Sequence, residues 1–125
     1  MSRTILLPID GSKNSQRAFD FYVNEVRHPE DKVLLVHVQN PPNLHSFSLK
    51  APLTIPTDEW TKQIQEEIKK SSEIVQHYEV SCEQKNISKH TLVGSGKPGE
   101  VIIGFVEQHQ PSLIVMGSRG LGTLR

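Results

Sequence analysis

The chain has 125 residues, the length of one domain, and it is long enough to bury about two thirds of the surface that the unfolded chain exposes. Its 14 basic and 14 acidic residues cancel, so nucleic acid and an anionic membrane surface are not expected as partners. The single cysteine, Cys82, cannot form an internal disulfide, and no apolar run approaches the about 20 residues that span a bilayer. We therefore expect a cytoplasmic protein with a single domain over residues 1–125.

The first predicted elements are a short apolar strand and a helix. Residues 4–10 are apolar on both faces, which is typical of a central strand, and Pro8 should lie at its end because proline lacks the N–H that a sheet uses. Asp10, Gly11 and Ser12 then turn the chain into a helix that runs to about Val26. Asp10 fits two roles, a structural helix cap or a carboxylate that accepts hydrogen bonds from ribose hydroxyls.

A second buried strand is predicted over residues 32–39, interrupted by His37. A lone histidine between apolar neighbours is usually a core or strand-end residue, and no serine, cysteine or second histidine stands at triad or metal-site spacing to it.

Residues 40–56 contain four of the eight prolines and little periodicity. This stretch is interpreted either as a lid or as a passive excursion.

A long helix begins at Thr57 or Asp58, and its three-and-four spacing predicts a face that covers the sheet, formed by Trp60, Ile64, Ile68, Val75, Tyr78 and Cys82. Cys82 is then a small buried apolar residue and not a reactive thiol.

A third strand follows over residues 87–93. Residues 94–99 form a literal Gly-x-Gly-x-x-Gly, but they follow a later strand and lack a ribose-binding acid about 20 residues on, so we reject the dinucleotide fingerprint. Pro98 starts a helix to about His109.

The last thirteen residues combine an apolar run with a glycine-rich stretch. Residues 113–116 are apolar on both faces and predict a fully buried strand. Glycines at 117, 120 and 122 then alternate with side chains that carry hydrogen-bond donors, Ser118, Arg119 and Thr123. Such a stretch is either an ordinary turn or a loop whose backbone N–H groups hold phosphate oxygens.

The sequence Val-Met-Gly-Ser-Arg-Gly at 115–120 resembles the nucleotide loop of the universal stress protein family, whose ATP-binding members carry Gly-x-x-Gly, nine residues, and then Gly-Ser or Gly-Thr. Gly117 and Gly120 match the first half, whereas the second half would fall beyond Arg125. Pro8 with Asp10, and Gly96 with Pro98, match two further family motifs, so the resemblance covers nearly the whole chain. Family domains continue through another helix and a fifth strand, and we expect this chain to continue likewise.

The resemblance implies an α/β fold: an open, doubly wound parallel sheet of strand order 3-2-1-4, with a fifth strand beyond the visible chain and helices on both faces. It also implies an adenine nucleotide site in which Val38 lies at the base and Asp10 at the ribose, with Pro8 among the binding residues. The phosphates would lie against the loop formed by Met116, Gly117, Ser118, Arg119, Gly120, Leu121, Gly122 and Thr123.

The implied function is that of a cytoplasmic ATP-binding stress-response protein, a homodimer that acts as a nucleotide-dependent regulator. AMP or ADP would fit the same site, and Mg²⁺ or Mn²⁺ would be held mainly by the phosphates. No catalytic residue or metal ligand is assigned, because no carboxylate or histidine is placed to activate a water, so ATP hydrolysis should be slow at most. One alternative is a nucleotide-free dimerisation or interaction scaffold, which the missing Gly-Ser favours. Another is an enzyme that adenylates a substrate beside residues 40–56.

Overall fold

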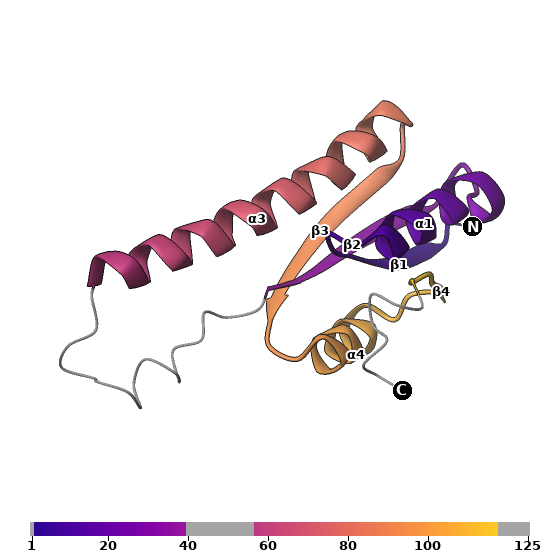
Figure 1. The fold of residues 1–125 in the computed structure, drawn as a ribbon. Helices are drawn as coiled ribbons and strands as arrows, with labels where there is room; N and C mark the ends of the chain where they lie inside the picture. Colours follow the sequence, from indigo (N-terminus) through magenta and orange to yellow (C-terminus); the bar gives the residue numbers. More distant parts are fainter. Residues whose placement is uncertain (1, 40–56, 118–125) are drawn as a thin grey trace.

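The computed structural model describes residues 2–39 and 57–117. In this part of the chain, four strands form one parallel sheet: β1 (Thr4–Ile9), β2 (Lys32–Gln39), β3 (Ser88–Ser95) and β4 (Leu113–Ile114). Their order is β3-β2-β1-β4, which confirms the predicted 3-2-1-4 arrangement and the central place of β1. Helices α1 (Lys13–Phe21) and α3 (Thr57–Gln84) lie on one side of the sheet, and α4 (Pro98–His109) lies on the other (Figure 1).

Helix α1 begins where the sequence predicts it. Ser12 is the N-cap, with an extended backbone, and its Oγ accepts the N–H of Ser15 at 3.1 Å. After Phe21 the helix continues as a single π-helical turn, η1 (Tyr22–Val26), in which the Arg27 N–H reaches the Tyr22 carbonyl at 2.9 Å. The predicted end near Val26 is therefore confirmed, although the last turn is wider than an α-helical turn.

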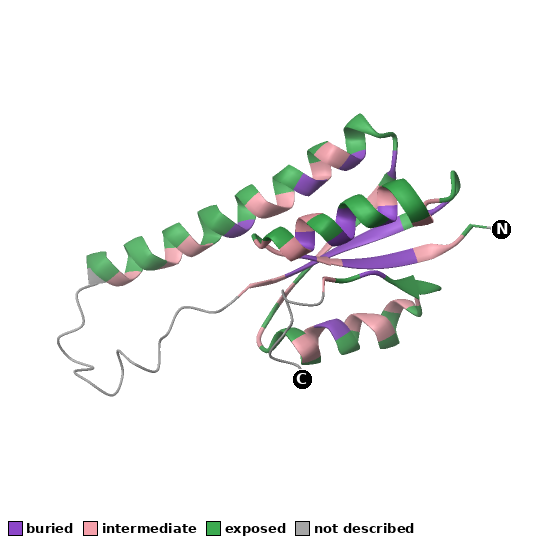
Figure 2. Cartoon of the chain, turned by 45° about the vertical axis from the view of Figure 1, so that its right-hand side comes forward, coloured by how far each residue is buried: buried purple, intermediate pink, exposed green. Residues whose placement is uncertain are grey.

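The core is divided by the sheet into two layers. The larger layer joins alternate residues of β1 and β2 to α1 and α3, and consists of Ile5, Leu7, Ile9, Ala18, Phe19, Tyr22, Val33, Leu35, Tyr78, Cys82, Ile87 and Val115. The smaller layer lies under α4 and is built on Leu6, Val36 and Ile102. Figure 2 shows the buried residues concentrated on the two central strands, β1 and β2, whereas the described residues of β3 and β4 are intermediate or exposed. Cys82 is fully buried, as predicted.

Helix α3 covers the sheet only with its carboxyl-terminal half. Tyr78 and Cys82 are buried there, as the spacing predicts, but Ile68 is 56% exposed, so its predicted place against the sheet is wrong. The reason is the length of the helix, which has 28 residues and extends well past the ends of the strands (Figure 1). An apolar face that continues beyond the sheet has no strand to cover.

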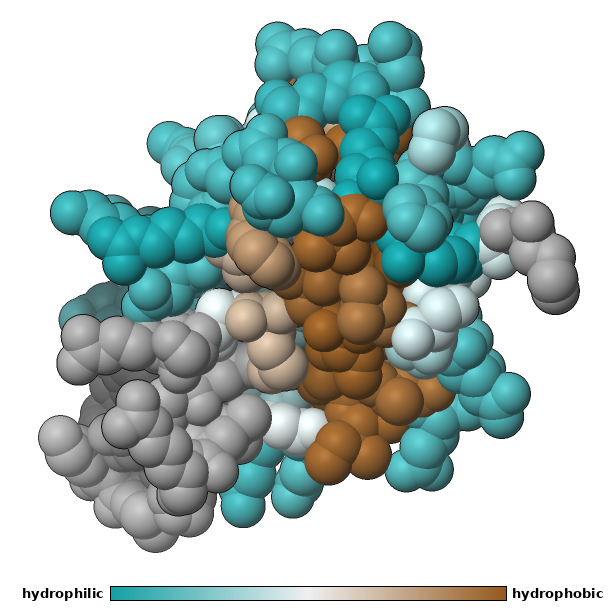
Figure 3. All heavy atoms as spheres, turned by 90° about the vertical axis from the view of Figure 1, so that its right-hand side faces the viewer, coloured by the Kyte–Doolittle hydropathy of each residue, from teal (hydrophilic) through white to brown (hydrophobic). Residues whose placement is uncertain are grey.

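The prediction of a fully buried fourth strand is also wrong. Strand β4 pairs with β1 through two residues, and its Leu113 and Ile114 side chains are 36% and 40% exposed, whereas the following Val115 is buried. Within the described residues β4 is one of the two edges of the sheet, and an edge strand that is apolar on both faces exposes apolar side chains. Figure 3 shows an apolar band on the face of the molecule that carries this edge.

Two glycines of the Gly-x-Gly-x-x-Gly stretch have structural roles. Strand β3 runs two residues further than predicted, so Gly94 belongs to it, and a Cβ there would collide with the Val101 side chain of α4. Gly96 has a φ of +129°, which L-residues rarely adopt, and it turns the chain into α4. Helix α4 then starts with Pro98 at its first position, as predicted. These roles agree with the rejection of the dinucleotide fingerprint.

Candidate functional site

A pocket of about 180 Å³ opens at the carboxyl ends of β1 and β2, beside the residues that follow β4. The strand order reverses at β1, since the chain runs from β1 to β2 on one side and returns to β4 on the other. Ligands of open α/β sheets bind at such a switch point. Ten residues line the pocket: Pro8, Ile9, Asp10, Ser15, Val36, Val38, Pro98, Ile102, Met116 and Gly117.

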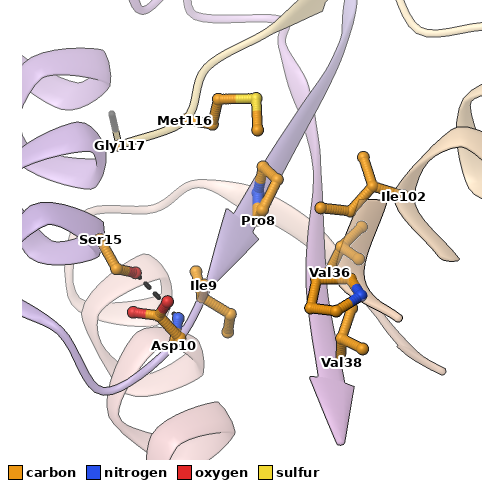
Figure 4. Close-up of a pocket in the computed structure, with 10 residues that line it drawn as sticks. Pro8, Ile9, Asp10, Ser15, Val36, Val38, Ile102, Met116 and Gly117 are labelled. Carbon is orange, nitrogen blue, oxygen red and sulfur yellow. Dashed lines mark hydrogen bonds between the residues drawn. The ribbon is translucent and has the colours of Figure 1, made fainter. Parts of the chain in front are cut away.

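Five of the predicted site residues are brought together by this pocket, namely Pro8, Asp10, Val38, Met116 and Gly117. They come from three separate segments of the sequence. In Figure 4, Asp10 and Gly117 lie on the side of α1, whereas Val38 lies on the side of α4. The other predicted residues, Ser118, Arg119, Gly120, Leu121, Gly122 and Thr123, lie outside the described residues, as does the stretch 40–56.

Asp10 is held by the turn between β1 and α1. Its Oδ1 accepts the backbone N–H of Ser12 at 2.8 Å, an Asx-turn, and its own N–H donates to the Ser15 Oγ at 2.9 Å. The helix cap is thus Ser12 and not Asp10. One carboxylate oxygen fixes the side chain, which leaves the other to accept a hydrogen bond at the pocket.

Ser15 links the pocket to α3. It is a buried polar residue, and its Oγ lies 3.0 Å from the Tyr78 hydroxyl while it also accepts the Asp10 N–H. The Tyr78 ring packs edge-on against Phe19, at 5.2 Å between ring centroids. Burial raises the pKa of Tyr78, so its hydroxyl stays protonated and available to this pair. The backbone around Asp10 is therefore positioned by two helices.

The opposite wall is apolar. Val36 and Val38 are two residues apart on β2 and so share one face of the sheet, and Ile102 of α4 stands over that face (Figure 4). Among the described lining residues, Asp10 carries the only formal charge. The pocket therefore suits an uncharged ring and a hydroxyl-bearing group, and any anionic part of a ligand would lie outside it.

Gly117 lies against the first turn of α1. A Cβ built on it would come within 2.6 Å of the Asn14 carbonyl oxygen and 2.8 Å of its carbonyl carbon. These are backbone atoms that cannot rotate away. The described structure therefore requires glycine at this position for packing, whatever the loop that follows it binds.

Five lining residues were not predicted: Ile9, Ser15, Val36, Pro98 and Ile102. The period-2 rule gives a signal for Val36, because it lies two residues before Val38 on the same strand. Ile102 has no such signal, since an apolar helix residue that lines a pocket looks like any core residue in sequence. His37 was predicted to be a satisfied core or strand-end residue, and this is half correct: its Nδ1 lies 3.3 Å from the Ile9 carbonyl oxygen, but its buried Nε2 has no partner in the described structure.

The sequence profile of the universal stress protein family matches residues 1–125, the whole chain. The chain belongs to the universal stress protein family. The universal stress protein YxiE of Bacillus subtilis is 27% identical to it over 126 residues, which cover all of this chain and 84% of that protein. The shared family agrees with the three motifs on which the resemblance was based.

Solved structures of other universal stress proteins share the fold. One from Arabidopsis thaliana, with AMP bound, superimposes with a TM-score of 0.72 at 20% identity and covers 97% of this chain and 80% of that one. One from Burkholderia pseudomallei has the same TM-score of 0.72 at 14% identity, with 98% and 86% covered. At such identities the likeness shows the fold alone.

Over residues 2–39 and 57–117, no three histidine, cysteine, aspartate or glutamate side chains are grouped as metal ligands. Within the same ranges, no helix combines the length and the apolarity needed to cross a membrane.

Proposed function

We propose that this universal stress protein binds an adenine nucleotide, ATP above all, in the pocket at the ends of β1 and β2. The observation that carries the proposal is the convergence of Pro8, Asp10, Val38, Met116 and Gly117, which family motifs assign to one site, around a single pocket at the switch point. The AMP in the Arabidopsis relative supports the ligand class.

The size and polarity of the pocket match the base and ribose. Its volume of about 180 Å³ is too small for a whole nucleotide but large enough for a ring, since a cavity of about 150 Å³ binds benzene. We place the base against Val36, Val38 and Ile102. The Asp10 carboxylate oxygen that the Ser12 N–H leaves free would accept a ribose hydroxyl.

The phosphates would leave the pocket past Gly117 and lie against the glycine-rich residues from Ser118 to Thr123. With no lysine or arginine among the described lining residues, the negative charge must be met by backbone N–H groups, by Arg119 and by Mg²⁺ or Mn²⁺ held mainly by the phosphates. The amino-terminal turn of α1, whose Asn14 lies against Gly117, would add the positive partial charge of a helix N-terminus.

Such a site favours binding over turnover. Asp10 is the one carboxylate among the described lining residues, and it faces the ribose in this arrangement, so no described lining residue serves as a base for water. We infer a nucleotide-dependent regulator of the stress response with slow ATP hydrolysis at most, in a single domain. A reducing, cytoplasmic location suits the free thiol of Cys82. We further propose a homodimer, as the resemblance to the family implies.

The test is the Asp10→Asn variant, titrated calorimetrically with ATP, ADP and AMP in the presence of Mg²⁺. Asparagine keeps the oxygen that accepts the Ser12 N–H but replaces the other acceptor with a donor. A hydrogen bond to a charged group contributes about 1.5–3 kcal/mol, so the affinity should fall roughly ten- to a hundredfold. Asp20→Asn makes the same change on the exposed side of α1 and should bind like the wild type. The absence of any nucleotide binding by the wild type would favour the scaffold alternative instead.

A further inference from the structure

A second pocket, of about 540 Å³, lies on the opposite face of the sheet, between α3 and the carboxyl-terminal ends of β2 and β3. Its floor includes His37, which stands between Val36 and Val38 on β2 and therefore points away from the first pocket. The volume is in the range of about 300–1,000 Å³ that is usual for small-molecule sites. The two pockets share strand β2, but none of the described residues lines both.

His37 brings a buried acceptor to this pocket. The residue is 4% exposed, and its Nδ1 lies 3.3 Å from the carbonyl oxygen of Ile9. A carbonyl oxygen only accepts, so Nδ1 carries the proton, and Nε2 of the neutral ring is left with a lone pair. Within the described structure Nε2 is buried and has no hydrogen-bond partner. An unpaired buried acceptor is costly, and an N–H donor from a ligand would satisfy it.

Glu79 gives the pocket a negative charge. The Thr91 hydroxyl donates to its Oε2 at 2.6 Å and so holds the carboxylate, while Oε1 has no hydrogen-bond partner among the described residues. Among the described residues that line this pocket, Glu79 alone carries a formal charge when His37 is neutral. Such a pocket repels phosphates and carboxylates and attracts a cation.

The other lining residues determine which kind of cation fits the pocket. Ile68, Val75 and Val93 give the pocket an apolar wall, and Ile68 and Val93 are large apolar side chains with more than a third of their surface exposed. A bare divalent ion is disfavoured, because a carboxylate and one imidazole fall short of a metal ligand set. We propose that this pocket binds a small organic cation, an ammonium or guanidinium group on a short aliphatic stem. Its N–H groups would donate to His37 Nε2 and Glu79, and its stem would cover the apolar wall.

The test titrates the full chain, without nucleotide, with n-butylammonium and follows the ¹⁵N resonance of His37 Nε2. A saturable shift in the millimolar range is expected, because the neutral acceptor gains an N–H donor. Butan-1-ol has the same stem without charge, and tetramethylammonium has the charge without an N–H, so both should bind far more weakly. A shift that does not saturate, or an equal response to butan-1-ol, would overturn the proposal.

The matched variants are Glu79→Gln and Glu83→Gln. In Glu79→Gln the side chain would keep an acceptor for the Thr91 hydroxyl but lose the charge, so n-butylammonium should bind at least about tenfold more weakly. Glu83 lies one turn further along α3 and outside the pocket, and its replacement should leave binding unchanged. Equal affinity in Glu79→Gln and the wild type would refute the site. Melting curves of both variants confirm that the comparison is made between folded proteins.

Discussion

Replacing Asp31 with asparagine should remove a buried carboxylate that ties the start of the chain to the turn before β2. The Arg3 Nε and Nη2 donate to its two oxygens at 2.9 and 2.8 Å, the Tyr22 hydroxyl donates at 2.8 Å, and the His28 N–H donates at 2.9 Å. The Asp31 side chain is 2% exposed. An asparagine can accept on only one side of this network and turns an N–H₂ group toward the donors on the other side.

The expected loss follows from the burial of the pair. Breaking a buried ion pair costs about 3–5 kcal/mol, and a hydrogen bond to a charged group about 1.5–3 kcal/mol. The Arg3 side chain is 27% exposed, so solvent compensates part of its lost partner, and we expect a smaller loss than for a fully buried pair, about 2–3 kcal/mol. For a domain of this length about 4 °C of Tm corresponds to 1 kcal/mol, so Tm should fall by about 8–12 °C.

The pH dependence gives the sharper readout. Hydrogen bonding from Arg3, against the opposing effect of burial, holds the pKa of Asp31 well below its usual value of about 3.9. A carboxyl group whose pKa is lowered by folding contributes its stability above the unfolded pKa, and the contribution is lost as the pH falls from about 4 toward the lowered value. The wild type should therefore lose more stability than Asp31→Asn between pH 5 and about 2.

Urea unfolding at a series of pH values measures both effects. The control is Asp20→Asn, because Asp20 is exposed and, among the described residues, bonds the Gln16 side-chain amide alone, so its loss should change stability by less than about 0.5 kcal/mol. The expectation is refuted if Asp31→Asn has the same free energy of unfolding as the wild type at pH 7. It is also refuted if the free energy of unfolding changes equally with pH in the two proteins, because the Asp31 carboxylate then does not stabilise the fold.

Three further predictions concern the pocket and the core. Gly117→Ala should cost about 1–3 kcal/mol of stability without any nucleotide, because its Cβ would meet helix backbone at 2.6 Å. Gly104→Ala, whose Cβ would have no described atom within 4 Å, should be neutral or stabilising by up to about 1 kcal/mol in thermal melts. Equal Tm values for the two variants would contradict the packing at Gly117. Tyr78→Phe should cost about 0.5–1.5 kcal/mol by removing the bond to the Ser15 Oγ, and no loss in urea unfolding would mean that this bond is dispensable. Burial raises the pKa of Cys82 to about 11, so iodoacetamide at pH 8 should alkylate it far more slowly in the native protein than in urea, and similar rates would argue against its burial.

The order of the elements and the sheet could be predicted because local signals and family motifs agree. Ser12 at a helix cap, Pro98 at a first helical position and the apolar run of β1 each identify an element from a few residues. The errors come from tertiary context. Ile68 and Ile114 have the same apolar character as buried residues, and only the length of α3 and the edge position of β4 make them exposed.

The candidate site could be predicted where residues stand in family motifs and not where they come from packing. Family motifs predict Pro8, Asp10 and Gly117. Ser15 and Ile102 reach the pocket because α1 and α4 pack against the sheet, and no local pattern in the sequence indicates how these helices pack. The Asp31 network was missed for the same reason, because an aspartate in a turn before a strand gives no sign that Arg3 and Tyr22 will enclose it.

Gly117 illustrates how a motif and a packing requirement can coincide at one residue. Its family motif assigns it to the phosphate loop, yet the Asn14 backbone already excludes a side chain there. Loss of ATP binding in a Gly117 variant would therefore not show that the glycine contacts phosphate, because the loop would be displaced in any case. Asp10→Asn avoids this ambiguity, since it preserves volume and the Ser12 hydrogen bond. If Asp10→Asn weakens binding without lowering Tm, the ribose role follows directly, and Gly117→Ala then measures how closely β4 and α1 must pack to hold that site.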